Sequence, residues 1–163
     1  MSLPPITGSG ASVADLATIE LRRIIDVLQV DHASLFLADA DEAGTAAMIA
    51  SIGTPVQDAL PAHGSVIARV LATGRVQQLH HVQGDPHGAR SALATPLLDD
   101  QQPVGVLLAV TLRQTRRLGL FETQVIGRAT ETLVARILAP WRRAERRTGS
   151  DRFVREADAP PRR

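Results

Sequence analysis

The residues best suited to ligand chemistry are histidines that gather in one part of the chain. Four of the five histidines lie in one irregular segment, namely His63, His80, His81 and His87, and Asp85 stands among them. Imidazole and carboxylate groups together bind divalent metal ions, and a single imidazole can ligate haem iron. The segment therefore raises two cofactor hypotheses, a metal ion and a haem.

The spacing of these histidines supports neither cofactor strongly. The segment has no His-x-x-x-His pair and the chain has no cysteine, whereas zinc sites commonly show one of these features. The adjacent His80 and His81 would point to opposite faces of an extended segment. Solvated loop histidines are the alternative, so no particular cofactor is implied.

Two further features favour an anionic ligand. His63 stands just ahead of a short helix that Ser65 is expected to cap, and helix N-termini attract anions. Arg90 can bind a carboxylate or phosphate through two parallel hydrogen bonds. The alternative for Arg90 is an ordinary salt bridge with Asp85 or with the pair Asp99 and Asp100.

Composition limits the classes of protein that can hold these residues. The 163 residues are enough for one domain with a full core, and 44% of them are apolar. With three Phe, one Trp and no Tyr, the core must be aliphatic. No apolar run approaches the roughly 18 residues of a membrane span, and the start shows no signal peptide. We expect a cytoplasmic protein with no membrane partner.

The C-terminal part of the chain is basic. Residues 142–163 hold eight arginines against four acidic residues. Such a tail can contact nucleic acid or acidic lipid. The simpler interpretation, and the one we adopt, is a solvated helix end running into a disordered terminus over residues 140–163. Residues 1–11, with two Pro and two Gly, are expected to be a flexible leader.

Periodicity between these ends predicts helices and strands. Ser12 and Asp15 form a capping-box pair ahead of an apolar stripe, so a helix is expected from there to residue 29. Gly74 should end the short helix that follows Ser65. A long last helix should bury one apolar stripe that includes Phe121 and Ile126, and Pro140 should kink or end this helix. The expected strands cover residues 33–38, 45–52, 75–79, 91–98 and 104–112, and the long helix covers residues 118–147.

Three stretches in order resemble the GAF domain family: SVIARVLATGRVQ at residues 65–77, RSALATPLLDDQQPVGVLLAV at 90–110, and LGLFETQVIGRATETLVARI at 118–137. The resemblance covers about residues 12–139. It implies an α+β sandwich with an antiparallel sheet of five or six strands. The terminal helices would pack on one face, and a lid formed by residues 54–90 would cover the other.

The resemblance also implies where a ligand would lie. The lid would enclose a cavity against the sheet, although it could instead simply cover the apolar strands. Side chains of the lid and the sheet would form the site. The polar candidates are His63, Ser65, His80, His81, Asp85 and Arg90, and the apolar wall would be Val66, Val70 and Leu97.

The function implied is sensory or regulatory: a domain that binds a small molecule or a partner protein and signals through its terminal helices. The alternatives are a dimerisation or scaffold module without a ligand and a haem-based redox or gas sensor. Zero cysteine excludes the relatives that attach a bilin or reduce methionine sulfoxide through Cys, and the cyclic-nucleotide motif needs Asn and Lys, which this chain lacks. We expect no enzymatic activity and no nucleic-acid partner.

A homodimer is expected because two amphipathic helices end one small domain. Apolar positions left over from the core could join a helical bundle across a twofold axis. The candidates are Ile19, Val27, Val134 and Trp141, with Trp141 as the anchor.

Overall fold

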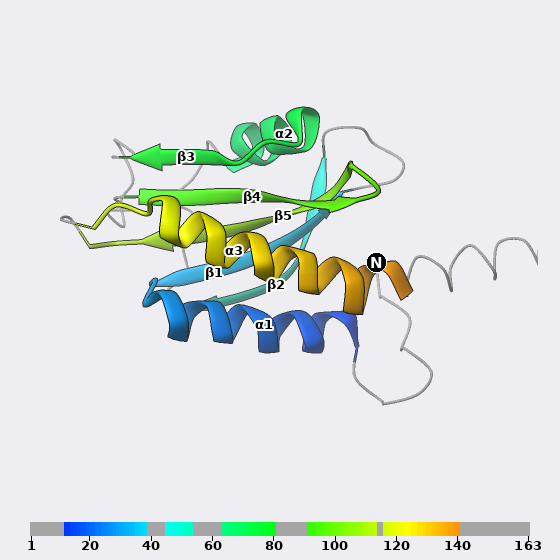
Figure 1. Ribbon diagram of the computed structural model, residues 1–163, viewed down its shortest axis with the longest axis horizontal. Helices are drawn as coiled ribbons and strands as arrows, with labels where there is room; N and C mark the ends of the chain where they lie inside the picture. Colours follow the sequence, from blue (N-terminus) through cyan, green and yellow to red (C-terminus); the bar gives the residue numbers. More distant parts are fainter. Residues whose placement is uncertain (1–11, 39–44, 54–62, 81–90, 114–115, 141–163) are drawn as a thin grey trace, which may run out of the picture.

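The computed structural model describes residues 12–38, 45–53, 63–80, 91–113 and 116–140. These residues form one five-stranded sheet with helices on both faces (Figure 1). In chain order the elements are α1 (Val13–Leu28), β1 (His32–Ala38), β2 (Ala46–Gly53), α2 (His63–Thr73), β3 (Gln77–His80), β4 (Ser91–Asp99), β5 (Gln102–Thr111), α3 (Leu120–Leu133) and the π-helical turn η1 (Val134–Leu138).

All neighbouring strands are antiparallel, in the order β2-β1-β5-β4-β3. The predicted β4–β5 hairpin is confirmed. Asp100 and Gln101 form its two-residue turn, and both have positive φ, as the tightest hairpin turns require. β1 then pairs with β5 and so joins the first hairpin, β1–β2, to the second.

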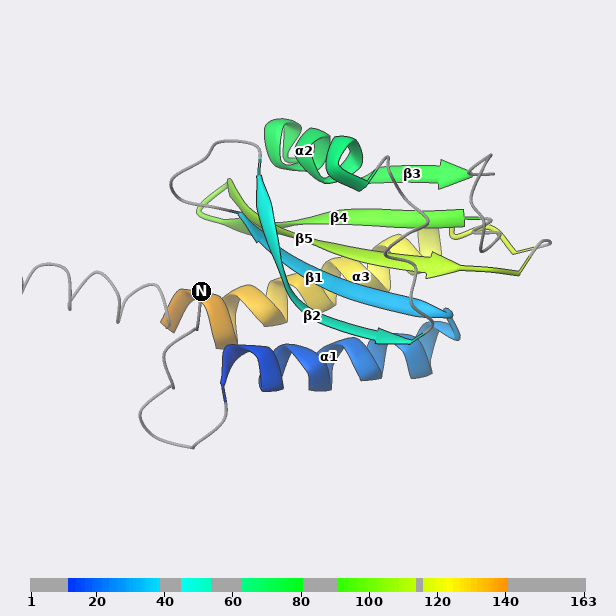
Figure 2. The same ribbon diagram turned by 180° about the vertical axis from the view of Figure 1, so that it is seen from behind.

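The two faces of the sheet carry different helices, as predicted. α1 and α3 lie side by side on one face, and α2 lies on the other (Figures 1 and 2). Alternate residues of β1 show the division: Ala33, Leu35 and Leu37 belong to the cluster under α1 and α3, while Phe36 packs against the cluster under α2. We call these the helix face and the lid face.

Local capping explains where α1 begins. The Ser12 hydroxyl accepts a hydrogen bond from the Asp15 backbone N–H, and the Asp15 carboxylate accepts one from the Ser12 N–H. These bonds pair two of the backbone donors that every helix start leaves open. The predicted capping box is therefore confirmed.

Two helix predictions need correction. α2 begins at His63, so Ser65 lies inside the first turn and not at the position ahead of the helix where it was expected. The last helix is not uniform: the Ala139 N–H bonds the carbonyl of Val134, five residues back, which defines the π turn. The helix is described as far as Pro140, so its predicted extension to residue 147 lies outside the described residues.

The phase of the last helix determines which of its side chains are exposed. Phe121, which was placed on the buried stripe, is 64% exposed. It lies roughly 140° around the helix from the buried Ile126. Val134, expected to remain at the surface for a dimer, is buried in the helix-face cluster. Both expectations were wrong: Phe121 lies off the buried stripe of α3, and Val134 packs into the helix-face cluster.

Gly105 makes a close approach between strands possible. A Cβ at this position would lie 2.4 Å from the Phe36 carbonyl oxygen of β1. Val104 is the extra residue of a bulge beside it, because Leu97 pairs with Gly105 while Leu98 pairs with Pro103. No residue with a side chain fits at position 105 without moving β1.

No helix in the described part of the chain is long and apolar enough to cross a membrane.

We predict opposite effects of alanine at two glycines. Gly105→Ala should lower the free energy of unfolding by about 1 to 3 kcal/mol, because the added methyl group meets backbone. Gly127→Ala should raise it by up to about 1 kcal/mol, because open space surrounds Gly127 on α3 and alanine favours helix. Urea denaturation of both variants measures this, and a neutral Gly105→Ala would contradict the close approach.

Candidate functional site

The lid face carries an apolar cluster beneath α2. Val66, Ile67 and Val70 of α2 pack on small and aliphatic side chains of β4 and β5. The strand residues in this cluster are Ala92, Ala94, Val106, Leu108 and Val110. This half of the lid face is therefore filled by the chain's own side chains.

Polar side chains lie on the neighbouring strand of the same face. His32 and Ser34 of β1 are both buried, with 2% and 1% of their surface exposed. They alternate with residues of the helix-face cluster, so both point to the lid face. The register places Ser34 between Ser51 of β2 and Leu108 of β5. Within the described residues, no group of three or more metal-ligating side chains comes together.

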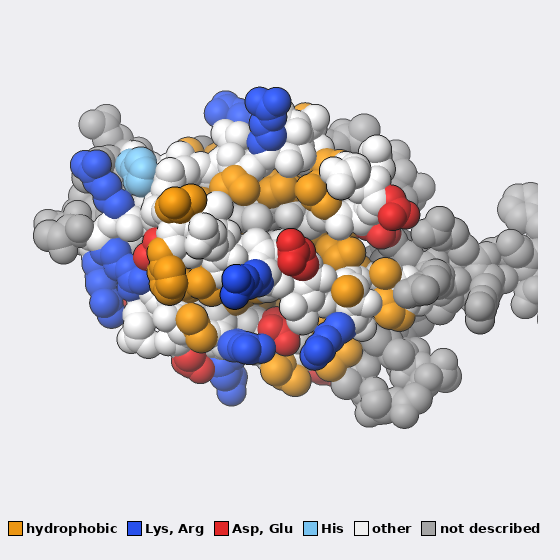
Figure 3. Space-filling model, viewed as in Figure 1, with side chains coloured by type: hydrophobic (Ala, Val, Ile, Leu, Met, Phe, Trp, Pro, Cys, Tyr) orange, Lys and Arg blue, Asp and Glu red, His pale blue; other side chains and the backbone are white. Residues whose placement is uncertain are grey.

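A groove runs between α1 and α3 on the outer side of the helix face. It holds two adjoining hollows of about 220 and 200 Å³. Apolar side chains occupy both walls, and Ile19 and Val27 of α1 are 63% and 54% exposed there. The charged side chains lining it are Glu20, Arg23, Arg128 and Arg136. Figure 3 shows orange apolar side chains among charges of both signs on this side of the molecule.

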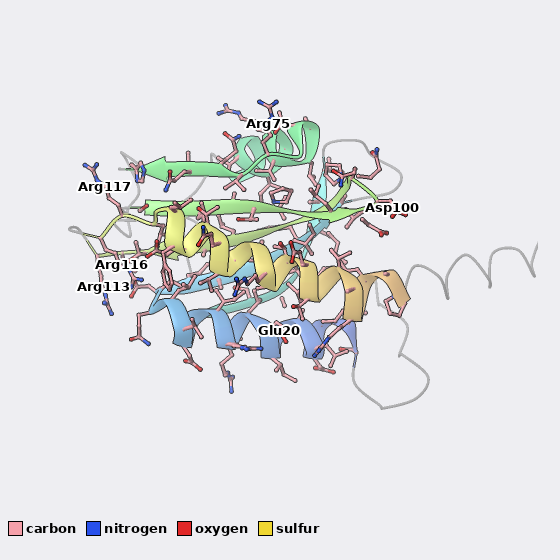
Figure 4. All side chains as sticks on the ribbon, in the orientation of Figure 1. Glu20, Arg75, Asp100, Arg113, Arg116 and Arg117 are labelled. Atoms are coloured by element: carbon pink, nitrogen blue, oxygen red, sulfur yellow. The ribbon has the colours of Figure 1, made fainter. Side chains whose placement is uncertain are left out.

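Arg116 links the two helices that form the groove. Its guanidinium donates hydrogen bonds to the carbonyl oxygens of Leu28 and Gln29 at the C-terminus of α1, the second at 2.7 Å. It also lies 3.6 Å from the carboxylate of Glu122, in the first turn of α3. Figure 4 shows that Arg113, Arg116 and Arg117 gather at this end of the molecule. A cation at a helix C-terminus and an anion at a helix N-terminus are both favourable.

Comparison with known proteins places this arrangement in a family. The family model described as GAF domain matches residues 12–137, which is most of the chain. The chain belongs to the GAF domain family. Its fold, with the terminal helices together on one face and a short helix on the other, is the one that the resemblance implied.

Solved GAF domains share the fold at low sequence identity. The GAF domain of an Acinetobacter phosphoenolpyruvate-protein phosphotransferase is 18% identical with a TM-score of 0.63, and the match covers 79% of this chain and 84% of that one. The second GAF domain of DevS from Mycobacterium smegmatis is also 18% identical, with a TM-score of 0.60 and coverage of 85% and 99%. A search of curated proteins found no significant match.

The predicted site residues of this GAF domain fall into four groups. Val66 and Val70 lie on the lid face as predicted. His63 and Ser65 lie in the first turn of α2, but their side chains lie outside what the structure describes. The remaining lid residues fall in the undescribed segment 81–90, so their predicted roles stay predictions. These residues are His81, Asp85 and Arg90, and His87 of the histidine cluster lies in the same segment.

Two predicted site residues point to the opposite face. Leu97 is part of the cluster under α1 and α3, so it cannot form a wall of a lid-face cavity. The His80 Nδ1 lies 3.3 Å from the hydroxyl of Ser91, which accepts a hydrogen bond from the Leu118 N–H ahead of α3. His80 therefore sits on the helix face at the edge of the sheet. Strand register fixes both positions, because Leu97 alternates with Leu93 of the helix-face cluster and His80 pairs with Ser91 of the same alternation.

Ser34 and His32 were missed as candidates on the lid face. A signal for Ser34 was present, because it is the one hydroxyl residue in the otherwise apolar stretch ASLFLA of β1. No sequence signal pointed to Arg116, since its hydrogen-bond partners are the carbonyl groups of Leu28 and Gln29, which are distant in the sequence.

Electrostatics at the helix starts follow from hydrogen bonds. Burial alone would raise the pKa of Glu122, but a hydrogen bond from the Gly119 backbone N–H, at 2.8 Å, and the nearby positive charge of Arg116 leave the pKa below its ordinary value. Backbone and hydroxyl hydrogen bonds from Ser12 lower the pKa of Asp15. Both carboxylates are thus held in the charged form that a helix N-terminus favours.

We predict that Arg116→Ala loosens the helix pair. The change should lower the free energy of unfolding by about 1.5 to 3 kcal/mol, because two carbonyls and a carboxylate lose a charged donor. The control is Arg117→Ala, an exposed arginine next to it, which should stay within about 0.5 kcal/mol of the wild type. Equal losses for the two variants, measured by urea denaturation, would count against the link.

We also predict a pH-dependent contribution from Glu122. Because its pKa is lowered in the folded state, its stabilisation is present above the ordinary value of 4.5 and is lost as pH falls through the folded-state pKa. Glu122→Gln should therefore lower the free energy of unfolding at neutral pH by about 0.5 to 1 kcal/mol, and the difference should shrink in acid. Denaturation across pH tests this, with Glu131→Gln, exposed on the same helix, as the control.

Proposed function

We propose that this GAF domain acts as a sensor that binds a small molecule on its lid face and transmits the bound state through α1 and α3 to a second copy of the chain. The observation that carries the proposal is the division of the sheet. One face holds the two terminal helices, with exposed Ile19 and Val27, and the other holds buried polar groups beside α2. A change on the lid face reaches the helices through side chains of the same strands.

The groove between α1 and α3 supports homodimerisation. Isolated exposed apolar side chains are ordinary, but here two of them flank hollows with apolar walls. Glu20 lies among Arg23, Arg128 and Arg136, so a second copy related by a twofold axis could pair its acid with these arginines. The remaining predicted dimer residue, Trp141, lies outside the described residues.

A binding role is favoured over catalysis. One structural neighbour is a free methionine-R-sulfoxide reductase from Thermoplasma acidophilum, 10% identical with a TM-score of 0.58. Thiol chemistry is impossible in this chain, which has no cysteine. We therefore propose regulation without an enzymatic step. We also propose a cytoplasmic location.

The second candidate is a scaffold that dimerises without a ligand. It is favoured by the packing of α2, since Val66, Ile67 and Val70 already fill the lid face over β4 and β5. The two candidates share the dimer and differ in the lid face over β1. A native mass spectrum of protein purified from its own host separates them, because a retained organic molecule supports the sensor and its absence supports the scaffold. An absorption spectrum of the same sample tests the haem alternative.

We predict that charges in the groove disrupt the dimer. Wild-type protein at tens of micromolar should sediment with twice the mass of the chain, whereas Ile19→Asp and Val27→Asp should sediment as folded monomers. Both side chains are exposed, so the fold should survive the change. Val76→Asp is the control, because Val76 is 38% exposed ahead of β3 and away from the groove. A monomeric wild type would contradict the proposal.

A further inference from the structure

Side chains of two neighbouring strands hold the residue that leads into α3. Leu118 lies just ahead of that helix, and none of its surface is exposed. Its N–H donates a hydrogen bond to the Ser91 hydroxyl of β4, at 3.2 Å, and its carbonyl accepts one from the side-chain amide of Gln78 on β3. We call Gln78, Ser91 and Leu118 the edge clasp. Because buried backbone groups need partners, the approach to α3 depends on it.

The strand β3 contacts both layers of the molecule. Its register pairs Gln78 with Leu93, which belongs to the helix-face cluster, so Gln78 points to the helix face. Leu79 pairs with Ala92 and packs against the apolar cluster beneath α2, so it points to the lid face. A shift of this one strand would therefore disturb a contact on each face.

The helix α2 leads into β3 through residues 74–76 alone. Gly74 has a positive φ of 61°, and its N–H bonds the carbonyl of Val70 at 2.8 Å, so the connection begins with a fixed turn. Val70 is fully buried in the cluster beneath α2. Because so few residues separate the two elements, a displacement of α2 on the lid face pulls on β3.

The position of β3 in the sheet allows two arrangements. It is an edge strand of four residues, and within the described part of the chain it pairs with β4 alone. Elements with few pairing partners open at low free energy while the rest of a fold stays intact. β3 is thus either docked on β4 or released from it. In Figure 1 the end of β3 and the start of β4 lie beside the start of α3.

We propose that the edge clasp couples the seat of α2 on the lid face to the first turn of α3, with β3 as the element that docks or releases. This inference rests on the proposed sensory function and names the strand that carries a change from one face to the other. Gln78 and Ser91 are positioning residues, because both act on the backbone of Leu118. Release of β3 removes the donor to the Leu118 carbonyl and loosens the start of the helix.

The test is a double-mutant cycle read by amide hydrogen exchange in the full-length protein. Val70→Ala disturbs the lid side, and Gln78→Ala removes the donor to the Leu118 carbonyl. The reporters are two N–H groups: that of Leu118, and that of Thr123, which bonds the Gly119 carbonyl in the first turn of α3.

Exchange rates are divided by that of the Leu107 N–H, which lies on the central strand β5 and reports unfolding of the whole sheet. Val70→Ala alone should raise the relative rates of both reporters at least about threefold. With Gln78→Ala present, Val70→Ala should change them less than about 1.5-fold, because the link is already cut. Gln77→Ala is the matched control: Gln77 pairs with Ala94 of the cluster beneath α2, so its loss should leave the threefold response intact.

Three results would overturn the inference. The first is no rise beyond that of the reference amide, the second is the same rise with Gln78→Ala present, and the third is a response lost in Gln77→Ala as well. Ile67→Val, a smaller truncation in the same cluster, should give the same pattern at smaller size and replaces Val70→Ala should that variant not fold. Sedimentation and a native mass spectrum separate the two proposals. A ligand-free monomer that shows the coupling contradicts only the sensor, and a ligand-bound dimer that lacks it contradicts only the clasp.

Discussion

The pairing of β1 with β5 brings together segments from opposite halves of the chain, and both faces of the molecule depend on it. Each hairpin alone would be a two-stranded ribbon with little to cover, since isolated hairpins are marginally stable in water. Joined through β1 and β5, they form a surface wide enough for α1 and α3 on one side and α2 on the other. The absence of a side chain at Gly105 lets the two backbones meet.

Local sequence was sufficient to predict three features that neighbouring residues determine among themselves. The capping box of Ser12 and Asp15 and the left-handed Gly74 that ends α2 were predicted because neighbours along the chain make those bonds. The β4–β5 hairpin was predicted for the same reason, since its two strands and its turn are contiguous. The GAF resemblance added the division of the helices between the faces.

Predictions failed where burial on both sides removes the usual alternation. β4 is buried from Ser91 to Leu97, so hydrophobicity cannot tell which of its side chains face the lid, and Leu97 was assigned to the wrong side. In the last helix the π turn shifts the stripe of apolar side chains by one residue, and no residue type in the sequence VARIL indicates such a turn. Arg116 acts on carbonyls that are distant in sequence, and carbonyls have no side-chain signature.

The start of α1 and the end of η1 lie at the same end of the sheet, where Leu16 and Ile19 meet Arg136 and Ile137 around one hollow (Figure 1). The two ends of the folded domain therefore lie close together, and the distance between them is small compared with the length of the sheet. The chain enters the domain through α1 and leaves it through α3 and η1. The axes of packed helices lie about 8 to 10 Å apart in proteins generally. A pull on these two ends would act directly on the helix pair and separate the helices from that end first.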